Sequence, residues 1–245
     1  MSADKQQTIS SVWTRPRRRE QQALSQEQIV AEAVRLLDAE GVEALSMRKL
    51  GIRLNAGATS LYRHVANKDE LIELVVDEVY GELEVRAIDD PADWRDAVAE
   101  SACSLRAMAL RHPWLASVLG QIGFSDLGPN LMGMSERLLA VFEKAGFELK
   151  VADQSMNTVI AYVVGTVTSE AAYLSLLARS GMTEEEWVHS LRPVVREATE
   201  GHPRVRTGFE AVQDQDPRQI RDDNFEFGLN RVLDGLESLL AKQVG

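Results

Sequence analysis

The chain has 245 residues, of which 44% are hydrophobic and 27% charged, a balance that supports a sizeable folded core and excludes disorder over most of its length. Its formal net charge of −11 is unevenly distributed, since residues 1 to 70 carry 11 Lys and Arg against 9 Asp and Glu, whereas the remainder carries 16 against 29. A basic head on an acidic body is an asymmetry that orients a molecule beside a nucleic acid.

The sequence predicts a cytoplasmic protein. Cys103 is the only cysteine, so no intramolecular disulfide and no thiolate zinc site can form, and we interpret its thiol as core filler. There is no run of about 18 apolar residues, and the first 22 residues hold no apolar stretch before a cleavage site. We therefore expect neither secretion nor membrane spanning.

Helix signals cover nearly the whole chain and period-2 runs of β-branched residues are absent, so the predicted fold class is all-α. A first helix is expected from about residue 25 to 40, because Ser25 and Gln28 form a capping box and Gly41 provides a stop. Its apolar stripe has helical spacing and consists of Ile29, Ala33, Leu36 and Leu37.

Two short helices and one longer helix are expected next. Ser46 caps a helix of two turns, the turn Asn55-Ala56-Gly57 follows, and a second short helix runs from about 57 to 64. Asn67 and Glu70 open the longer helix, which links the head to the body as far as about residue 85. The inward-facing apolar residues of the two short helices are Met47, Leu50, Leu54, Leu61 and Val65.

Beyond Asp89-Asp90-Pro91 we expect an all-helical body over residues 91–245. Its helices are predicted at about 92–111, 130–145, 151–179, 183–199 and 222–241. The stretch from 200 to 221, which holds Gly201, Pro203, Gly208 and Pro217, is expected to be a long loop, and the sequence leaves open whether it is ordered or mobile.

Two short helices joined by a tight turn and braced by a preceding helix are typical of a helix-turn-helix, whose second helix enters the major groove of DNA. The outward face of this second helix carries small residues at its start and aromatic and basic residues at its end. A Thr methyl can meet a thymine methyl, an Arg can reach guanine, and Tyr, His and Lys can donate to phosphates. The candidate residues over 24–70 are Ala58, Thr59, Ser60, Tyr62, Arg63, His64 and Lys68.

The segment LSMRKLGIRLNAGATSLYRHVANKDEL, residues 45 to 71, resembles the DNA-binding motif of the tetracycline-repressor (TetR) family. The family pattern Leu-Tyr-x-His-Phe/Val-x-x-Lys is matched from Leu61 to Lys68. Weaker similarity continues through 111–130, 136–147 and 225–240. The resemblance implies a DNA-binding head in which Arg48 also contacts DNA, although a solvated Arg48 is the alternative, and a regulatory body like that of the tetracycline repressor.

The chain departs from the family pattern at the turn. Asn55 stands where many members have Gly, and Gly57-Ala58-Thr59-Ser60 replaces Ser-x-Gly-Thr, so the operator sequence is not carried over. No histidine matches the residue that helps to hold a magnesium–drug complex in the tetracycline-binding relatives, so tetracycline is not the expected ligand.

Residues 1–23 are expected to form a flexible basic arm. Arg17, Arg18 and Arg19 precede the first helix and follow Pro16, and such an arm can lie in the minor groove or along the phosphates. The alternative is a solvated basic tail.

A ligand-binding region is expected among the middle helices. Polar groups on an otherwise apolar helix need partners, and a small molecule is one possibility. Core packing is the alternative for the aromatic members. The candidate residues are Trp114, Asn157, Tyr162, Thr166 and Glu170.

A symmetric dimer is expected through the last long helices, because each carries an apolar stripe and because Gly228 and Gly235 let backbones approach closely. Packing inside the chain's own core is the alternative. The candidate interface residues are Trp187, Leu191, Val195, Leu229, Val232, Leu236 and Leu240.

No metal, no cofactor and no catalysis are expected, since the four histidines lack metal-site spacing and the nucleophile elbow, P-loop and Gly-x-Gly-x-x-Gly motifs are absent. The sequence therefore predicts a homodimeric transcriptional regulator that represses from a palindromic double-stranded operator until a small molecule binds. A helical-bundle enzyme or carrier with a non-functional head is the alternative.

Overall fold

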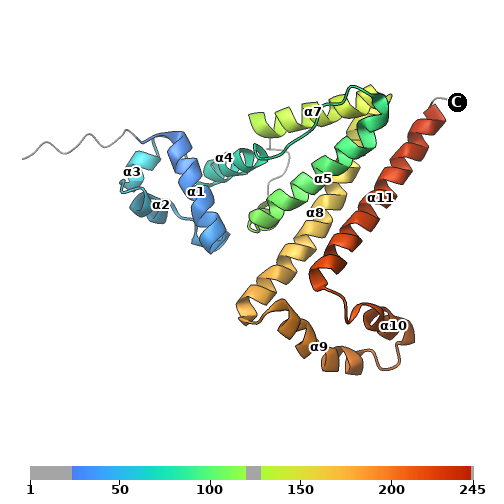
Figure 1. Cartoon of the computed structure of the whole chain (residues 1–245). Coiled ribbons are helices and arrows are strands. Elements are labelled where there is room, and N and C mark those ends of the chain that lie inside the picture. The colour runs from blue at the N-terminus through green and yellow to red at the C-terminus, as the bar shows by residue number, and fades with distance from the viewer. Residues whose placement is uncertain (1–23, 120–127, 244–245) are drawn as a thin grey trace, which may run out of the picture.

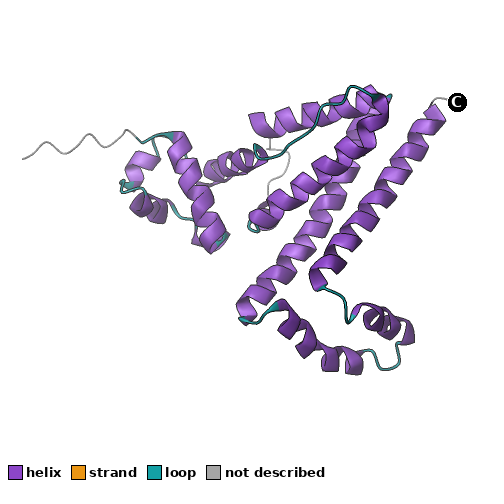
Figure 2. Cartoon of the chain, in the orientation of Figure 1, coloured by secondary structure: helices purple, strands orange, loops and turns teal. Residues whose placement is uncertain are grey.

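The computed structural model describes residues 24–119 and 128–243, and within these ranges every regular element is helical (Figure 2). The all-α prediction is confirmed. The arm residues Arg17, Arg18 and Arg19 lie outside the described ranges.

The head contains α1 (Gln26–Glu40), the short 3₁₀ turn η2 (Val42–Ala44), α2 (Met47–Arg53) and α3 (Ala58–Leu61). The predicted caps are present, since Ser25 and Gln28 bond reciprocally and the Ser46 hydroxyl accepts from the Lys49 amide at 3.2 Å. α3 is shorter than predicted because the amides of Arg63 and His64 bond carbonyls three residues back, which tightens the last turn. The helices share a buried apolar core of Ile29, Ala33, Leu36, Leu37, Leu50 and Leu61.

The linking helix α4 (Lys68–Tyr80) begins at the predicted cap, where the Asn67 side chain accepts from the Glu70 amide at 2.8 Å. The Glu70 carboxylate bonds the amide of Ala66 at 2.5 Å instead of closing the box on Asn67. Val75, Val76 and Val79 are buried in a core cluster that runs without a break from the head into the body.

The body is built on α5 (Trp94–Arg111), preceded by the 3₁₀ turn η3 (Pro91–Asp93), and on α7 (Pro129–Ala145) and α8 (Leu149–Ser180). These three helices pack on one another, and α11 (Pro217–Gln243) runs alongside α8 (Figure 1). A short helix that the sequence did not indicate, α6 (Leu115–Leu119), follows α5 and contacts α8. Trp94, Phe142 and Phe147 pack ring against ring at centroid distances of 5.3 to 6.0 Å.

The prediction of a loop over residues 200–221 was wrong. α9 (Glu184–Ala198) is followed by α10 (Pro203–Val212), and α11 already begins at Pro217; α9 and α10 form an arm beyond the end of the bundle (Figure 1). Pro203 and Pro217 stand where helices begin, and the first helical position needs no backbone N–H. Val205, Phe209 and Val212 then repeat at helical spacing.

Cys103 is exposed, so its interpretation as core filler was wrong. It lies off the buried stripe of α5 that includes Ala102 and Leu105.

α8 is long and apolar enough to cross a membrane by length and composition alone, a test that core helices of soluble proteins also pass. Only 22% of its apolar window is buried in the chain, so a large part of its surface is open.

Candidate DNA-binding surface

The turn between α2 and α3 is held by two backbone features. Asn55 has φ 50°, the left-handed conformation that Asn tolerates, at the predicted turn. Gly51 is buried, and its carbonyl accepts from the Ala56 amide at 2.8 Å. A Cβ at position 51 would lie 2.8 Å from the Ala56 carbonyl oxygen, so the close crossing of α2 and the turn requires glycine.

The outward face of α3 and its last turn presents the predicted residues to solvent. Thr59, Tyr62 and Arg63 are exposed, with Tyr62 at 52%, while Leu61 and Val65 are fully buried beneath them. Ala58, Ser60, His64 and Lys68 are half-buried at the edges of this face. The His64 carbonyl accepts from the Gln26 side chain at 3.1 Å, which fixes the end of the turn against α1.

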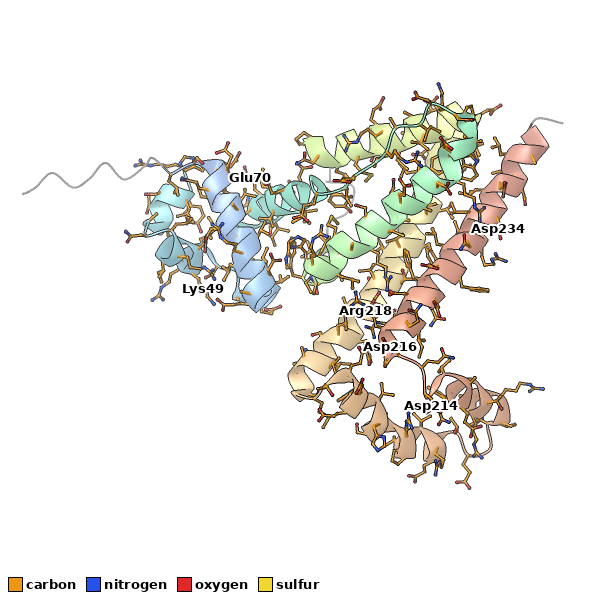
Figure 3. All side chains as sticks on the ribbon, viewed as in Figure 1. Lys49, Glu70, Asp214, Asp216, Arg218 and Asp234 are labelled. Carbon is orange, nitrogen blue, oxygen red and sulfur yellow. The ribbon has the colours of Figure 1, made fainter. Side chains whose placement is uncertain are left out.

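The basic residues of the head fall into two groups. Lys49, labelled in Figure 3, pairs with Glu40, and Arg53 lies 2.5 Å from Glu32 and 3.5 Å from Glu40. α1 thus neutralises both. Arg48, Arg63 and Lys68 form no ion pair within the described ranges, and Arg48 and Arg63 are exposed. The unpaired cations are therefore those that the sequence predicted to contact DNA.

A polar junction joins the head to the body. His112, at the end of α5, is buried, and its Nδ1 lies 2.7 Å from Asp38 on α1 and its Nε2 3.1 Å from Glu82 just after α4. Trp114 donates its indole N–H to the same Asp38 oxygen at 2.7 Å. Sequence reasoning missed Asp38, Glu82 and His112 because no local pattern pairs positions so far apart.

A second junction links α4 to α7. The Asp77 carboxylate accepts from the backbone amides of Asn130 and Leu131, both at 3.0 Å, at the N-terminus of α7. The Asn130 side chain donates to the Asp77 carbonyl at 3.0 Å. A carboxylate at a helix N-terminus is favoured by the free amides and by the helix dipole. α4 is therefore bonded to α7, and Glu82, two residues beyond the end of α4, is bonded to the end of α5.

The charge of Glu82 is set by the first junction. Partial burial alone would raise the pKa of its carboxyl, but hydrogen bonds from Arg111 and His112 outweigh burial and hold that pKa below its ordinary value. Arg111 donates to Glu82 through two nitrogens at 2.6 and 3.2 Å. The junction therefore favours an ionised Glu82.

Most residues predicted to bind a ligand have partners within the chain. The Tyr162 hydroxyl donates to the Phe225 carbonyl at 2.8 Å, and Thr166 donates to carbonyls of its own helix. Glu170 accepts two bonds from Arg106, both 2.9 Å, and one from Arg221. Asn157 is exposed and Trp114 belongs to the junction, so these five side chains have separate surroundings.

A small cavity lies instead between α5, α7 and α8. Its volume is about 20 Å³, and its wall includes Val98, Leu105, Met134, Leu138 and Val159. That volume is enough for a single water molecule. Two serines are buried in the same helices, and the Ser155 hydroxyl finds no hydrogen-bond partner in the described part of the chain.

The residues predicted for a dimer interface divide between core and surface. Leu229 and Leu236 of α11 are buried in the chain's own core, and Val232 and Leu240 pack against it. α9 has no buried residue. Leu191 is 37% exposed there, and Trp187 and Val195 are half-buried.

Two family models match the chain. The model described as "Bacterial regulatory proteins, tetR family" matches residues 29–75, and "Tetracyclin repressor-like, C-terminal domain" matches residues 88–240. Among curated relatives, the HTH-type transcriptional repressor DrrR1 of Streptomyces coeruleorubidus is 33% identical over 100% of this chain and 90% of its own length. An HTH-type transcriptional regulator of Saccharopolyspora erythraea is 39% identical over 66% of this chain and 69% of that protein.

Solved structures share the fold. Apo ActR from Streptomyces coelicolor superimposes with a TM-score of 0.75 at 29% identity, over 91% of this chain and 99% of ActR. ActR in complex with actinorhodin gives a TM-score of 0.69 at 31% identity, over 88% of this chain and 96% of ActR.

Proposed function

The chain belongs to the TetR family of bacterial transcriptional regulators, and from this premise we propose that it is a cytoplasmic repressor that leaves a palindromic operator when a small molecule binds its body. The observation that carries the proposal is the exposed face of α3, where Thr59, Tyr62 and Arg63 stand beside unpaired cations while the other basic residues of the head are neutralised. The chain is a regulator rather than an enzyme.

On this face the residues divide into two roles. Ala58 and Thr59 let the backbone approach the base edges, and Arg63 bonds guanine. Ser60, Tyr62, His64, Lys68 and Arg48 contact phosphates, which position the head without specifying sequence. Arg17, Arg18 and Arg19 extend the phosphate contacts as a basic arm.

Specific recognition requires two heads, because one head makes too few base contacts and a palindrome places half-sites about 34 to 36 Å apart. We assign the dimer to the open sides of α8 and α11, which run side by side. The exposed side of α8 is small or apolar at helical spacing, with Ala161, Gly165, Thr168, Ala172 and Leu176. α11 adds Phe227, Gly235 and Leu239, all exposed. We therefore assign the interface to these exposed residues instead of Leu229 and Leu236, which the sequence predicted and which are buried in the chain's own core.

The ligand enters the body between α5, α7 and α8. ActR, a relative, was solved in complex with actinorhodin and with (S)-DNPA, which supports a small-molecule ligand for the present chain. In the present chain the cavity between these helices holds about one water, so a larger ligand must part the helices as it binds. α7 is bonded to α4 through Asp77, and the end of α5 is bonded to Asp38 of α1 and to Glu82 just after α4, so displacement of either helix moves the head.

Selection from random-sequence DNA followed by gel shift tests the proposal. We expect enrichment of a palindrome of 10 to 20 base pairs, roughly two half-sites long. A small-molecule library is then screened against the selected operator. Reciprocity requires that a ligand which weakens operator binding is itself bound more weakly by the operator complex, by the same factor. Failure to enrich any DNA sequence would overturn the proposal that the chain is a sequence-specific regulator. If no compound altered operator affinity, the chain would instead be a DNA-binding protein that no small molecule controls.

A further inference from the structure

Two carboxylates face the two ring nitrogens of His112 in the polar junction between head and body. The His112 side chain is buried, its Nδ1 lies 2.7 Å from Asp38 Oδ1, and its Nε2 lies 3.1 Å from Glu82 Oε1. An ionised carboxylate can only accept hydrogen bonds. Both contacts are therefore hydrogen bonds only when both ring nitrogens carry a proton, which makes the ring an imidazolium.

Further donors favour the ionised, accepting form of both carboxylates. Trp114 donates its indole N–H to the same Asp38 oxygen at 2.7 Å. Arg111 donates to Oε2 of Glu82, the oxygen that His112 does not use. A neutral His112 would therefore place the lone pair of one ring nitrogen against a carboxylate oxygen.

The charges in contact around His112 balance when its ring is charged. Among the described residues they are Asp38 from α1, Glu82 just after α4, and Arg111 from α5 itself. With an imidazolium, two cations meet two anions, whereas a neutral ring leaves an excess of one negative charge. Because charge-assisted hydrogen bonds are about twice as strong as neutral ones, loss of the proton removes one bond and weakens the other.

We propose that His112 is a pH-sensitive switch between head and body. As an imidazolium it bonds both α1 and the segment after α4 to the end of α5, and as a neutral ring it releases one of them. An imidazole ordinarily changes charge between about pH 5 and 8, whereas carboxylates and guanidinium groups do not. The bonding that needs the proton is thus complete at lower pH and is lost as pH rises.

The switch bears on DNA binding through the proposed function, on which this step rests. A head that is already held against the body loses less freedom when it binds an operator than a loosened head does. Operator affinity should therefore fall as His112 loses its proton.

Two measurements on the full chain without DNA test the switch. Nuclear magnetic resonance of isotope-labelled histidine distinguishes an imidazolium from each neutral tautomer, and we expect His112 to be an imidazolium at pH 6 and to lose one proton as pH rises. Hydrogen exchange, corrected for the intrinsic effect of pH on the exchange rate, reads the same event. Protection at the end of α1 or in residues 81–84 should fall by about tenfold, the loss expected for one bond to a charged group.

Two glutamine variants serve as controls for hydrogen exchange. His112→Gln has a side chain that does not titrate, so its protection in these segments should not change between pH 6 and pH 8. His189→Gln, at an exposed position on α9, should keep the pH dependence of the wild type.

Operator binding across the same pH range tests the consequence. His64 lies on the predicted DNA-binding face and titrates as well, so the proteins compared both carry His64→Gln. Affinity for the selected operator should fall more steeply with pH when His112 is present than when it is replaced by glutamine.

Each measurement can contradict the proposal. A His112 ring that is neutral at pH 6 would overturn the switch, and so would protection that does not change with pH or that changes equally in His112→Gln. Equal pH dependence of operator affinity with and without His112 would overturn its regulatory role. Failure to enrich an operator would overturn the proposed function alone, because resonance and hydrogen exchange decide on the switch without DNA.

Discussion

At the scale of single residues, the head shows how ion pairing sorts similar side chains into different roles. Lys49 and Lys68 are both lysines near the helix-turn-helix, yet Lys49 pairs with Glu40, whereas Lys68 forms no ion pair within the described ranges. A cation already paired within the protein gains less from a phosphate than an unpaired one, because it must give up or share its partner.

Lys68→Ala should therefore weaken binding to all DNA sequences and reduce the slope of log affinity against log salt by about 1. Lys49→Ala is the matched control and should change both quantities less. Arg63→Ala should instead relax base preference at one position, at a cost of about 1–3 kcal/mol for that base contact. Fluorescence anisotropy across a salt series checks all three; equal slopes for Lys68→Ala and wild type would contradict the phosphate role.

A second residue-scale prediction concerns the crossing of α2 and the turn. Gly51→Ala places a Cβ 2.8 Å from a backbone oxygen, which cannot rotate away as a flexible side chain can. We expect a loss of about 1–3 kcal/mol in the free energy of unfolding. Gly208→Ala on α10 is the control, since its Cβ would meet open space in a helix that gains from alanine. Urea denaturation measures both, and an unchanged midpoint for Gly51→Ala would mean that the turn shifts freely.

At the scale of elements, the end of α5 is coupled to the head because His112 bonds both Asp38 of α1 and Glu82 just after α4. Removing His112 would leave the carboxylates of Asp38 and Glu82 without a shared partner. His112→Ala should therefore speed hydrogen exchange in α1 and in the last turn of α4, while His189→Ala, an exposed position on α9, should not. Mass spectrometry reads both regions, and unchanged exchange there would show that apolar packing alone holds the junction.

The lowered pKa of Glu82 gives this junction a pH dependence. A carboxyl group whose pKa is lower in the folded state adds stability above its unfolded pKa, about 4.3, and loses that stability as pH falls through the folded pKa. The wild type should therefore lose more stability between pH 5 and pH 3 than Glu82→Gln does. Urea denaturation at a series of pH values checks this, and parallel curves would contradict an ionised Glu82 at the junction.

Local sequence patterns predicted most of the helices, but they could not predict contacts between residues far apart in the chain. The caps at Ser25, Ser46 and Asn67 were found because each lies within three residues of its bond partner. Asp38 and His112 were missed because their contact joins positions 74 residues apart. The polar residues of α8 were misleading for a related reason: Glu170 has its partners on α5 and α11, which a single helix cannot reveal.

At the scale of the whole molecule, much of the apolar surface of α8 is exposed in the single chain, and we propose that a second copy buries it. Gly165 and Gly235 each have open space where a side chain would stand, so a large residue at either position fits the isolated chain but blocks a close approach by a second copy. Gly165→Arg with Gly235→Arg should therefore give a folded monomer with lost operator affinity. Sedimentation of this variant beside Ala140→Arg, an exposed position on α7, tests the interface. A dimer that persisted would place the two-fold axis elsewhere.

The bonds of Asp38 and Asp77 also restrict how freely the parts of this protein can be exchanged. A hybrid regulator that joins a foreign head to this body at Asn67 keeps Asp77 and its cap on α7, but it loses Asp38 with α1. His112 and Trp114 would then face whatever the foreign helix presents at that position. A graft that retains sensing must therefore bring a carboxylate to the end of its first helix, besides apolar residues that continue the shared core. Compatibility between heads and bodies thus depends in part on a side chain that lies outside the predicted DNA-binding face.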